Sequence, residues 1–169
     1  MITQLPLPAE LTGPAGALLL RNAGESDLDP LLALLSNDPI SAARGDTAAE
    51  EDRPVYLAAL REISASPANA LLVVADDAEI VGTMQLTRIP GMARRGATRL
   101  LIEAVRVSGR RRSGGIGGLM MRWVIEVAAP ATGSTLIQLT SDASRQDAHR
   151  FYERLGFVGS HVGFKYRVQ

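Results

Sequence analysis

The chain is 169 residues long, 46% of its residues are hydrophobic and 21% are charged, and 18 basic side chains balance 18 acidic ones. This length suits one domain with its own core, and the net charge of zero argues against a protein that binds nucleic acid by electrostatic attraction. The absence of cysteine excludes a disulfide framework and a thiolate nucleophile, and two histidines, His149 and His161, leave little material for a zinc centre, so no metal is expected.

Residues 1–14 contain three prolines and a glycine and are predicted to form an irregular leader to a single domain over residues 15–169. The amino terminus lacks the basic and then apolar segments of a signal peptide, and no apolar run reaches about 18 residues. We therefore expect a soluble, cytoplasmic protein without a membrane partner.

The first part of this domain combines strand and helix signals. Four leucines, at positions 28, 31, 32 and 35, recur at helical spacing, and the first turn of the next helix is rich in carboxylates, with Pro54 as the start of its regular part. The expected order is a strand over residues 18–23, helices over residues 28–36 and 47–63, and a β-hairpin with strands over residues 70–75 and 80–87.

The second part alternates single strands with helices. A strand is expected over residues 100–107, a helix over residues 117–128 and a strand over residues 136–140. A last helix, capped by Ser144 and Asp147 and stopped at Gly156, is followed by closing strands from Phe157 through residues 164–168. A hairpin followed by alternating strands and helices predicts an α+β fold with a mixed, mostly antiparallel central sheet and flanking helices.

An arginine cluster and a glycine-rich turn separate the strand at residues 100–107 from the following helix. The turn, Ser113-Gly114-Gly115-Ile116-Gly117-Gly118, directly follows three arginines at positions 110–112. A helix start presents unpaired N–H groups and the positive end of the helix dipole, and glycines let a ligand approach the backbone closely. The sequence therefore predicts a phosphate-binding turn, to which an arginine adds a charged, bidentate partner.

Two common phosphate-binding loops do not match this turn. A P-loop requires a lysine after its last glycine, and the only lysine of the chain is Lys165. A dinucleotide-binding fingerprint requires a glycine where this chain has Met120. The remaining alternative is a purely structural turn whose glycines supply positive φ.

The spacing Arg112-x-x-Gly115-x-Gly117, preceded by Val105-x-Val107, resembles the acetyl-CoA-binding signature of the GNAT superfamily of N-acetyltransferases. A second segment, residues 147–157, resembles the Ala-x-x-x-Tyr-x-x-x-Gly-Phe motif of the same family. The likeness covers roughly residues 70–164. Two positions depart from it, because Ser113 replaces a common glycine and Arg145 a common asparagine.

The resemblance implies a GNAT-type acyl-CoA N-acyltransferase fold with acetyl-CoA as the acyl donor. In that family the amides of the turn hold the CoA pyrophosphate, and the preceding strand opens so that its backbone pairs with the pantetheine arm. The implied cofactor-binding positions are Val105, Arg106, Val107, Arg112, Ser113, Gly114, Gly115, Ile116, Gly117 and Gly118.

Two residues are candidates for catalysis. Tyr152 lies on an apolar helical face and is either a core tyrosine or, as the resemblance implies, the general acid that protonates the departing thiolate. Glu103, predicted by alternation to share a face with Val105 and Val107, either pairs with an arginine such as Arg99 or acts as a general base for the amine.

The other arginines near the turn carry less information. Arg106, Arg110 and Arg111 are either solvated loop charges or ligands of the CoA 3′-phosphate. His149 is expected to be exposed and to take no part in catalysis.

The resemblance implies an enzyme that moves an acetyl group directly from acetyl-CoA to a primary amine of a small molecule or peptide. A module of the same fold that binds acyl-CoA without turnover, and an unrelated nucleotide- or phosphate-binding domain, stay open as alternatives. The expected partners are acetyl-CoA and the amine acceptor, without nucleic acid, and a homodimer stays open as well.

Overall fold

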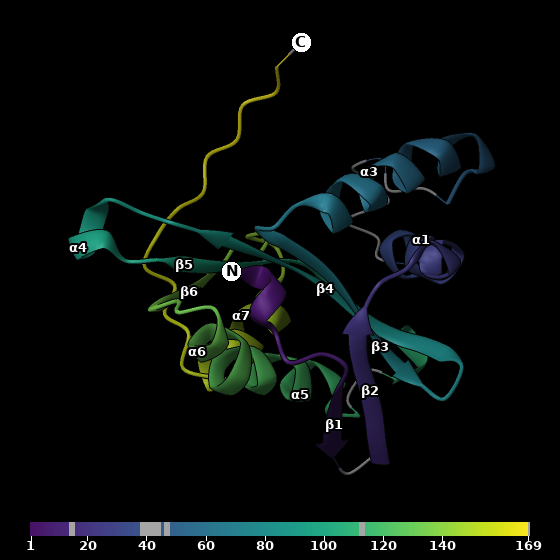
Figure 1. Cartoon of the computed structure of the whole chain (residues 1–169), viewed down its shortest axis with the longest axis horizontal. Helices are drawn as coiled ribbons and strands as arrows, with labels where there is room; N and C mark the ends of the chain where they lie inside the picture. Colours follow the sequence, from purple (N-terminus) through teal and green to yellow (C-terminus); the bar gives the residue numbers. More distant parts are fainter. Residues whose placement is uncertain (14–15, 38–44, 46–47, 112–113, 169) are drawn as a thin grey trace. The chain divides into compact units, whose positions relative to one another are not determined.

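The computed structural model describes residues 1–13, 16–37, 45, 48–111 and 114–168 (Figure 1). The chain forms two compact units, Met1–Gln138 and Leu139–Gln169, and each is described by itself.

The first unit is built on a six-stranded sheet whose strands follow one another in sequence order, from β1 to β6 (Figure 1). Each pair of neighbours from β1 to β5 is antiparallel. The strands are β1 Ala9–Gly13, β2 Gly16–Asn22, β3 Asn69–Asp76, β4 Glu79–Ile89, β5 Arg99–Val107 and β6 Leu136–Leu139. The last residue of β6 opens the second unit.

Helical segments accompany this sheet along the chain. They are η1 Ile2–Gln4, η2 Glu25–Asp27, α1 Leu28–Ser36, η3 Glu50–Asp52, α3 Arg53–Ala65, α4 Ala93–Gly96, η4 Gly109–Arg111, α5 Ile116–Trp123, the π-helical segment η5 Val124–Ala128, α6 Ala129–Ala131 and α7 Gln146–Arg154. The mixed α+β architecture with flanking helices is therefore confirmed.

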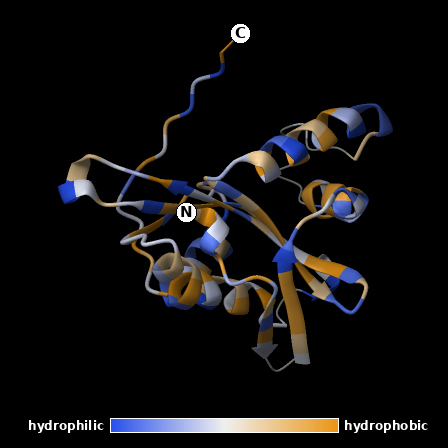
Figure 2. Ribbon diagram, in the orientation of Figure 1, coloured by the Kyte–Doolittle hydropathy of each residue, from blue (hydrophilic) through white to orange (hydrophobic). Residues whose placement is uncertain are grey.

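Helices cover both faces of the sheet in the first unit. On one face, Leu31 and Leu34 of α1 pack on Val73 of β3. The side chain of Val74, the next residue along β3, points to the opposite face, as alternation requires. On that face, Gly82 of β4 lies between Val74 and α5. A methyl group added to Gly82 would lie 3.3 Å from the Met120 sulfur of α5 and 3.5 Å from the Val74 Cβ, so α5 covers this face. Because both faces are covered, the central strands carry long hydrophobic stretches (Figure 2).

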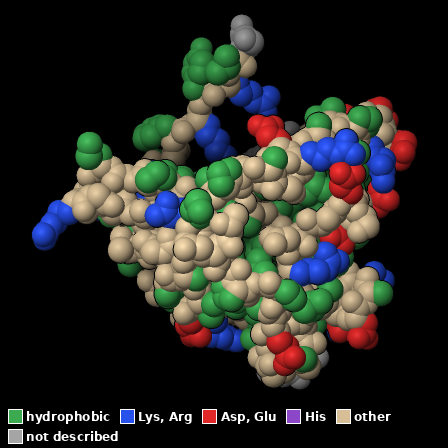
Figure 3. All heavy atoms as spheres, viewed as in Figure 1, with side chains coloured by type: hydrophobic (Ala, Val, Ile, Leu, Met, Phe, Trp, Pro, Cys, Tyr) green, Lys and Arg blue, Asp and Glu red, His purple; other side chains and the backbone are tan. Residues whose placement is uncertain are grey.

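Ion pairs attach α3 to the segments that precede it. Arg61 makes two hydrogen bonds of 2.8 Å to Glu25, and Arg53 lies 3.0 Å from Asp29 of α1. Basic and acidic side chains accordingly lie side by side over this part of the surface (Figure 3).

A more buried ion pair lies where β2 leads into η2. The guanidinium of Arg21 donates to both oxygens of Asp27, at 2.7 and 2.8 Å, and the Gly24 amide donates to the same carboxylate at 2.8 Å. Hydrogen bonding from Arg21 lowers the pKa of Asp27, although the burial of this side chain, which is 7% exposed, opposes the shift. The carboxylate thereby fixes the turn from β2 into α1.

Several sequence predictions need correction at the ends of the chain. The irregular leader is wrong for Ala9–Gly13, which pairs with the adjacent β2 as strand β1, although the prolines of this segment favour irregular structure. The closing strands are also wrong, because no strand forms over the described residues 157–168. A strand requires hydrogen bonds from a neighbour, and an alternating sequence alone does not supply them.

Helix boundaries differ less from prediction. The second helix begins at Arg53, with Pro54 in its first turn, and Thr47, where it was expected to start, lies outside the described residues. The helix expected over residues 117–128 runs as α5, η5 and α6 to Ala131 and buries Leu119, Met120 and Trp123, whereas Val127 is half-buried.

Candidate active site

A β-bulge in β5 decides which way its side chains point. Gln85 of β4 lies opposite Glu103 and Thr83 lies opposite Arg106, so two steps along β4 face three steps along β5. The extra residue falls at Ala104–Val105, and Ala104 has a φ of 50°, in the left-handed region. A bulge of one residue reverses the alternation of the strand beyond it.

The expected grouping of Glu103 with Val105 and Val107 is therefore wrong. Because Thr83 and Gln85 point to one face of β4, their opposite residues Glu103 and Arg106 share that face. Val107, opposite Gly82, points to the other face. Alternation failed here because it counts residues along one strand and cannot detect an extra residue in the pairing.

Glu103 lies on the face that α1 covers, since Thr83 is also opposite Val73. Its side chain is exposed, and no described residue pairs with its carboxylate. Arg99 donates instead to Gln138 at 3.2 Å, and Arg106 donates from Nη1 to the Val105 carbonyl at 2.8 Å. Pairing with Arg99, one of the arginines considered as a partner of Glu103, does not occur.

Polar side chains continue across this face beside Glu103. Asn69 of β3 accepts hydrogen bonds from Thr87 at 2.6 Å and from Gln85 at 3.4 Å, and donates to Ser66 at 2.9 Å. Gln85 is directly opposite Glu103, a placement that brings Cβ atoms within about 5.5 Å. The sequence offered no local signal for this row, because it depends on the register of three strands.

The glycine-rich turn leads into α5 as the phosphate-binding prediction requires. Gly115 has a φ of 82° and precedes the helix, and the Leu119 amide makes the first helical bond, 3.0 Å to the Gly115 carbonyl. The amides of Ile116, Gly117 and Gly118 lie in the first turn, where a helix has no acceptors for its N–H groups. Together with the helix dipole, they form a site suited to a phosphate.

Arg112 and Ser113, two predicted cofactor-binding residues, lie outside the described residues. The positive φ of Gly115 also satisfies the structural alternative, so glycine at this position is required with or without a ligand.

Main-chain hydrogen bonds hold residues 108–111 and Gly114. The Ser108 amide donates to Val81 of β4 at 2.8 Å, the Arg111 amide donates to Ser108 at 2.9 Å, and the Gly114 amide donates to Arg111 at 3.2 Å.

Two arginines beside the turn are ion-paired to the β3–β4 hairpin. Arg111 pairs with Asp76, and Arg110 lies 3.3 Å from Glu79. Sequence reasoning treated Asp76 and Glu79 only as turn residues. The only sign of this pairing in the sequence was the negative charge of Asp76 and Glu79, which is opposite to that of Arg110 and Arg111.

The second half of β5 extends beyond its neighbour β6. The Thr135 amide donates to the Thr98 carbonyl at 3.0 Å, so β6 starts beside the start of β5. β6 has four residues and β5 has nine, and each residue advances a strand by about 3.3 Å. The strand residues of β6 are therefore too few to follow β5 to Val107.

The second unit contains Tyr152, on α7. The helix ends in a Schellman motif, in which Gly156, with a φ of 88°, donates to Glu153 at 2.9 Å and the Phe157 amide donates to the Tyr152 carbonyl at 3.1 Å. The Tyr152 ring packs edge-on against Phe151 and Phe157, at centroid distances of 5.1 and 5.8 Å. The predicted stop at Gly156 is confirmed, and the Gly-Phe end of the motif has a structural explanation.

Two other predictions for this unit are corrected. The expected capping by Ser144 does not form, because its hydroxyl donates to Asp142 at 2.6 Å and Arg145 occupies the N-cap. His149 is half-buried rather than exposed, and its Nε2 lies 2.9 Å from the Asp142 carbonyl oxygen.

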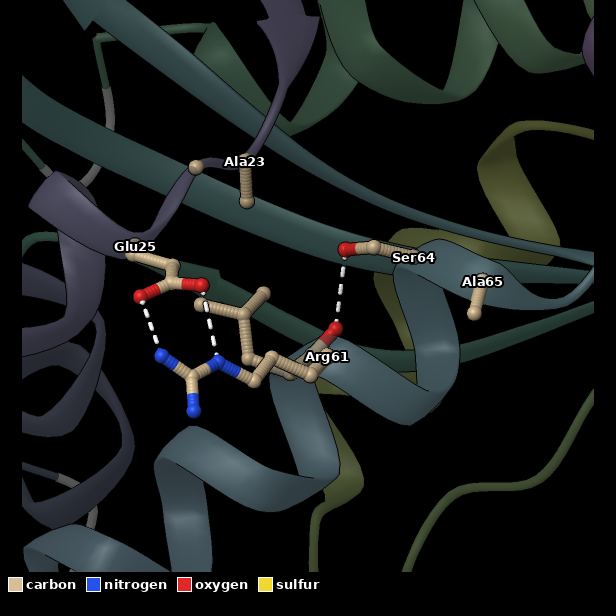
Figure 4. A pocket seen from close by; sticks show the side chains of 7 residues that line it. Ala23, Glu25, Arg61, Ser64 and Ala65 are labelled. Atoms are coloured by element: carbon tan, nitrogen blue, oxygen red, sulfur yellow. Dashed lines mark hydrogen bonds and ion pairs between the residues drawn. The ribbon is translucent and has the colours of Figure 1, made fainter.

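In the first unit, a cavity of about 450 Å³ lies between the end of β2 and α3 (Figure 4). Its polar wall is the ion pair between Arg61 and Glu25, whose hydrogen bonds lower the pKa of Glu25. Ser64, also in the lining, donates to the Leu60 carbonyl at 2.8 Å. None of the predicted site residues lines this cavity.

The described residues include no group of three or more His, Cys, Asp or Glu side chains that could hold a metal ion. Within the same residues, no helix combines the length and the apolar character that a membrane crossing requires.

Comparison with known proteins shows the family of the chain and supports its fold. Residues 33–157 match the Acetyltransferase (GNAT) family, and the chain belongs to that family. Its structure is similar to that of a Bacillus halodurans C-125 protein described as a transcriptional regulator, with a TM-score of 0.84, 38% identity, and coverage of 89% of this chain and 99% of the other. It is also similar to a Trypanosoma brucei acetyltransferase, with a TM-score of 0.71, 25% identity, and coverage of 89% and 99%.

A shorter match is to the aminoalkylphosphonate N-acetyltransferase of Salmonella typhimurium. The two sequences are 43% identical over 49 residues, which are 29% of this chain and 31% of that enzyme.

Proposed function

We propose that this GNAT family member is an acetyl-CoA-dependent N-acetyltransferase that moves the acetyl group directly to a primary amine of a small molecule or peptide. The observation that carries the proposal is the start of α5, where the amides of Ile116, Gly117 and Gly118 are suited to the CoA diphosphate. Arg112, Ser113, Gly114 and Gly115 complete this loop in the proposal.

The second half of β5 supplies the next part of the proposed site. Main-chain groups of Val105, Arg106 and Val107 would bind the pantetheine arm, and an N–H of this strand would polarise the thioester carbonyl. Much of the catalytic gain would then come from holding two substrates in position.

We assign Glu103 as the general base and Tyr152 as the general acid. Glu103 takes a proton from the ammonium form of the substrate, directly or through water, and the neutral amine nitrogen then attacks the thioester carbon. The carbon–sulfur bond breaks, the departing thiolate takes the Tyr152 proton, and the nitrogen of the new amide returns a proton to Tyr152. An alkylamine has a pKa near 10 and is almost wholly protonated at pH 7, so a base is required. The exposed Glu103 carboxylate, free of any described ion-pair partner, supports its assignment.

A thermal shift with acetyl-CoA followed by an amine screen tests this function. Ligand at 100 times its Kd should stabilise the protein by about 2.7 kcal/mol. The screen measures release of the CoA thiol with small polar amines, aminoglycosides, polyamines, peptide N-termini and, given the Salmonella relative, aminoalkylphosphonates. Absence of both stabilisation and thiol release would contradict the proposal.

A second candidate is a regulatory module that binds acyl-CoA without turnover, which the description of the Bacillus halodurans relative favours. Stabilisation by acetyl-CoA without thiol release for any amine would support this candidate. In either case we propose that residues 15–169 act as one domain without a metal, and that nucleic acid is not a partner of this chain, whose net charge is zero.

A further inference from the structure

We propose that the end of the β3–β4 hairpin positions the CoA-binding turn, through Asp76 on Arg111 and Glu79 on Arg110. These arginines then anchor the turn and do not contact the CoA 3′-phosphate. The inference rests on the proposed function, because it concerns the same turn. It makes Asp76 and Glu79 positioning residues.

The two carboxylates form a pair that needs cations nearby. Asp76 and Glu79 lie directly opposite each other in the last pair of the hairpin, and like charges in that arrangement destabilise a sheet. Two consecutive arginines of η4 provide one cation for each carboxylate. The match of two facing anions with two adjacent cations is a specific docking arrangement.

The two ion pairs are not equivalent. Arg111 and Asp76 have side chains that are 40% and 26% exposed, whereas Arg110 and Glu79 are 88% and 51% exposed. Solvent weakens an exposed pair, so most of the anchoring is expected from Asp76 and Arg111.

Arg111 is well placed to transmit this restraint to α5. Its amide donates to Ser108, which is itself bonded to Val81 of β4, and its carbonyl accepts from Gly114. Gly115 and the first amides of α5 follow immediately. Fixing the Arg111 side chain on the hairpin therefore restrains a residue at the centre of the connection between the sheet and the proposed diphosphate site.

This arrangement favours one of two roles for the arginines. A guanidinium held by a carboxylate is already partly neutralised and restrained, which suits an anchor better than a phosphate ligand. If it anchors instead, losing it weakens CoA and dephospho-CoA equally, since these ligands differ only in the 3′-phosphate.

The test is calorimetric binding of CoA and of dephospho-CoA to the whole protein. Asp76→Asn and Arg111→Gln should each weaken both ligands by about fivefold, and the double variant should lose little more than either single one. Asp76→Glu should restore most of the affinity. In steady-state assays the KM for acetyl-CoA should rise while kcat stays unchanged. Glu25→Gln is the matched control, since it removes an ion pair of similar type away from the turn and should leave binding unchanged.

Hydrogen exchange of residues 108–119 in the unliganded protein provides a readout that does not depend on CoA. Asp76→Asn should speed exchange in this segment and leave other segments unchanged. If the wild-type protein does not bind CoA, the proposed function fails, and the exchange result still decides whether the hairpin holds the turn. Unchanged or tighter CoA binding in Asp76→Asn, a loss in Arg111→Gln confined to CoA, or unaltered exchange would each overturn the inference.

Discussion

At the scale of single residues, the hydroxyl of Tyr152 is the group whose role can be tested most directly. Its ring is held between Phe151 and Phe157, so Tyr152→Phe removes the hydroxyl and preserves this packing. If the hydroxyl protonates the thiolate, we expect turnover to fall about 100-fold while acetyl-CoA affinity stays within twofold. Steady-state kinetics and calorimetry measure the two quantities.

Tyr166, which is 90% exposed, provides the control for this substitution. Tyr166→Phe should change neither quantity. Unchanged turnover in Tyr152→Phe would leave Tyr152 as a packing residue at the end of α7.

Asp27 carries a second prediction at this scale, in which pH is the variable. Because its folded-state pKa is lowered, mainly by Arg21, the ionised form stabilises the fold. This contribution is fully present above the unfolded-state pKa of about 3.9 and is lost as pH falls through the lower folded-state value. We expect Asp27→Asn to reduce the free energy of unfolding by about 1–3 kcal/mol at pH 7, because Arg21 loses its partner.

Urea denaturation of both proteins at pH 7 and at pH 3 or below measures this effect, and the difference should shrink at the lower pH. Asp29→Asn is the control, since Asp29 is 72% exposed in its pair with Arg53 and should contribute at most about 0.5 kcal/mol. Equal losses for Asp27→Asn at both pH values would contradict the assignment.

At the scale of elements, the bulge in β5 is the feature that orients Glu103, and Ala104 bears its strain. A non-glycine residue in the left-handed region costs about 1 kcal/mol, whereas glycine elsewhere in a strand costs about 0.5–1 kcal/mol. With a φ of 50° at Ala104, we expect Ala104→Gly to leave the free energy of unfolding unchanged or to raise it.

The matched substitution is Ala17→Gly in β2, an exposed strand position without positive φ. It should lower the free energy of unfolding by about 0.5–1 kcal/mol in the same denaturation experiment. A similar loss for Ala104→Gly would mean that residue 104 does not adopt the left-handed conformation in solution.

Elements that depend on local signals could be predicted from the sequence. The hairpin follows from two apolar runs around an acidic turn, the start of α5 from its glycines, and the end of α7 from Gly156. Strand β1, which pairs with the adjacent β2, was missed because the prolines around it favour irregular structure. The bulge could not be predicted, because it depends on the register between β4 and β5. The face of Glu103 was wrong for the same reason.

At the scale of the whole molecule, membership of the family can be recognised from one continuous segment of the sequence. Residues 105–118 hold both the strand and the turn of the proposed acyl-CoA site, and the family match includes them. The residues that we propose to position this site are not close to it in sequence. Asp76 and Glu79 come from a hairpin about 30 residues earlier and contact Arg111 and Arg110 only in the folded protein.

The composition of the whole chain also constrains the kinetic mechanism. None of its 169 residues is a cysteine, so a thiolate, the side-chain nucleophile that most readily accepts an acyl group from a thioester, is missing. We expect both substrates to bind before transfer, which gives intersecting lines in double-reciprocal plots when acetyl-CoA and the amine are varied together. Incubation with acetyl-CoA alone should leave the intact mass of the protein unchanged. Parallel lines together with a gain of one acetyl mass would instead require a covalent intermediate on another side chain, and direct transfer would be wrong.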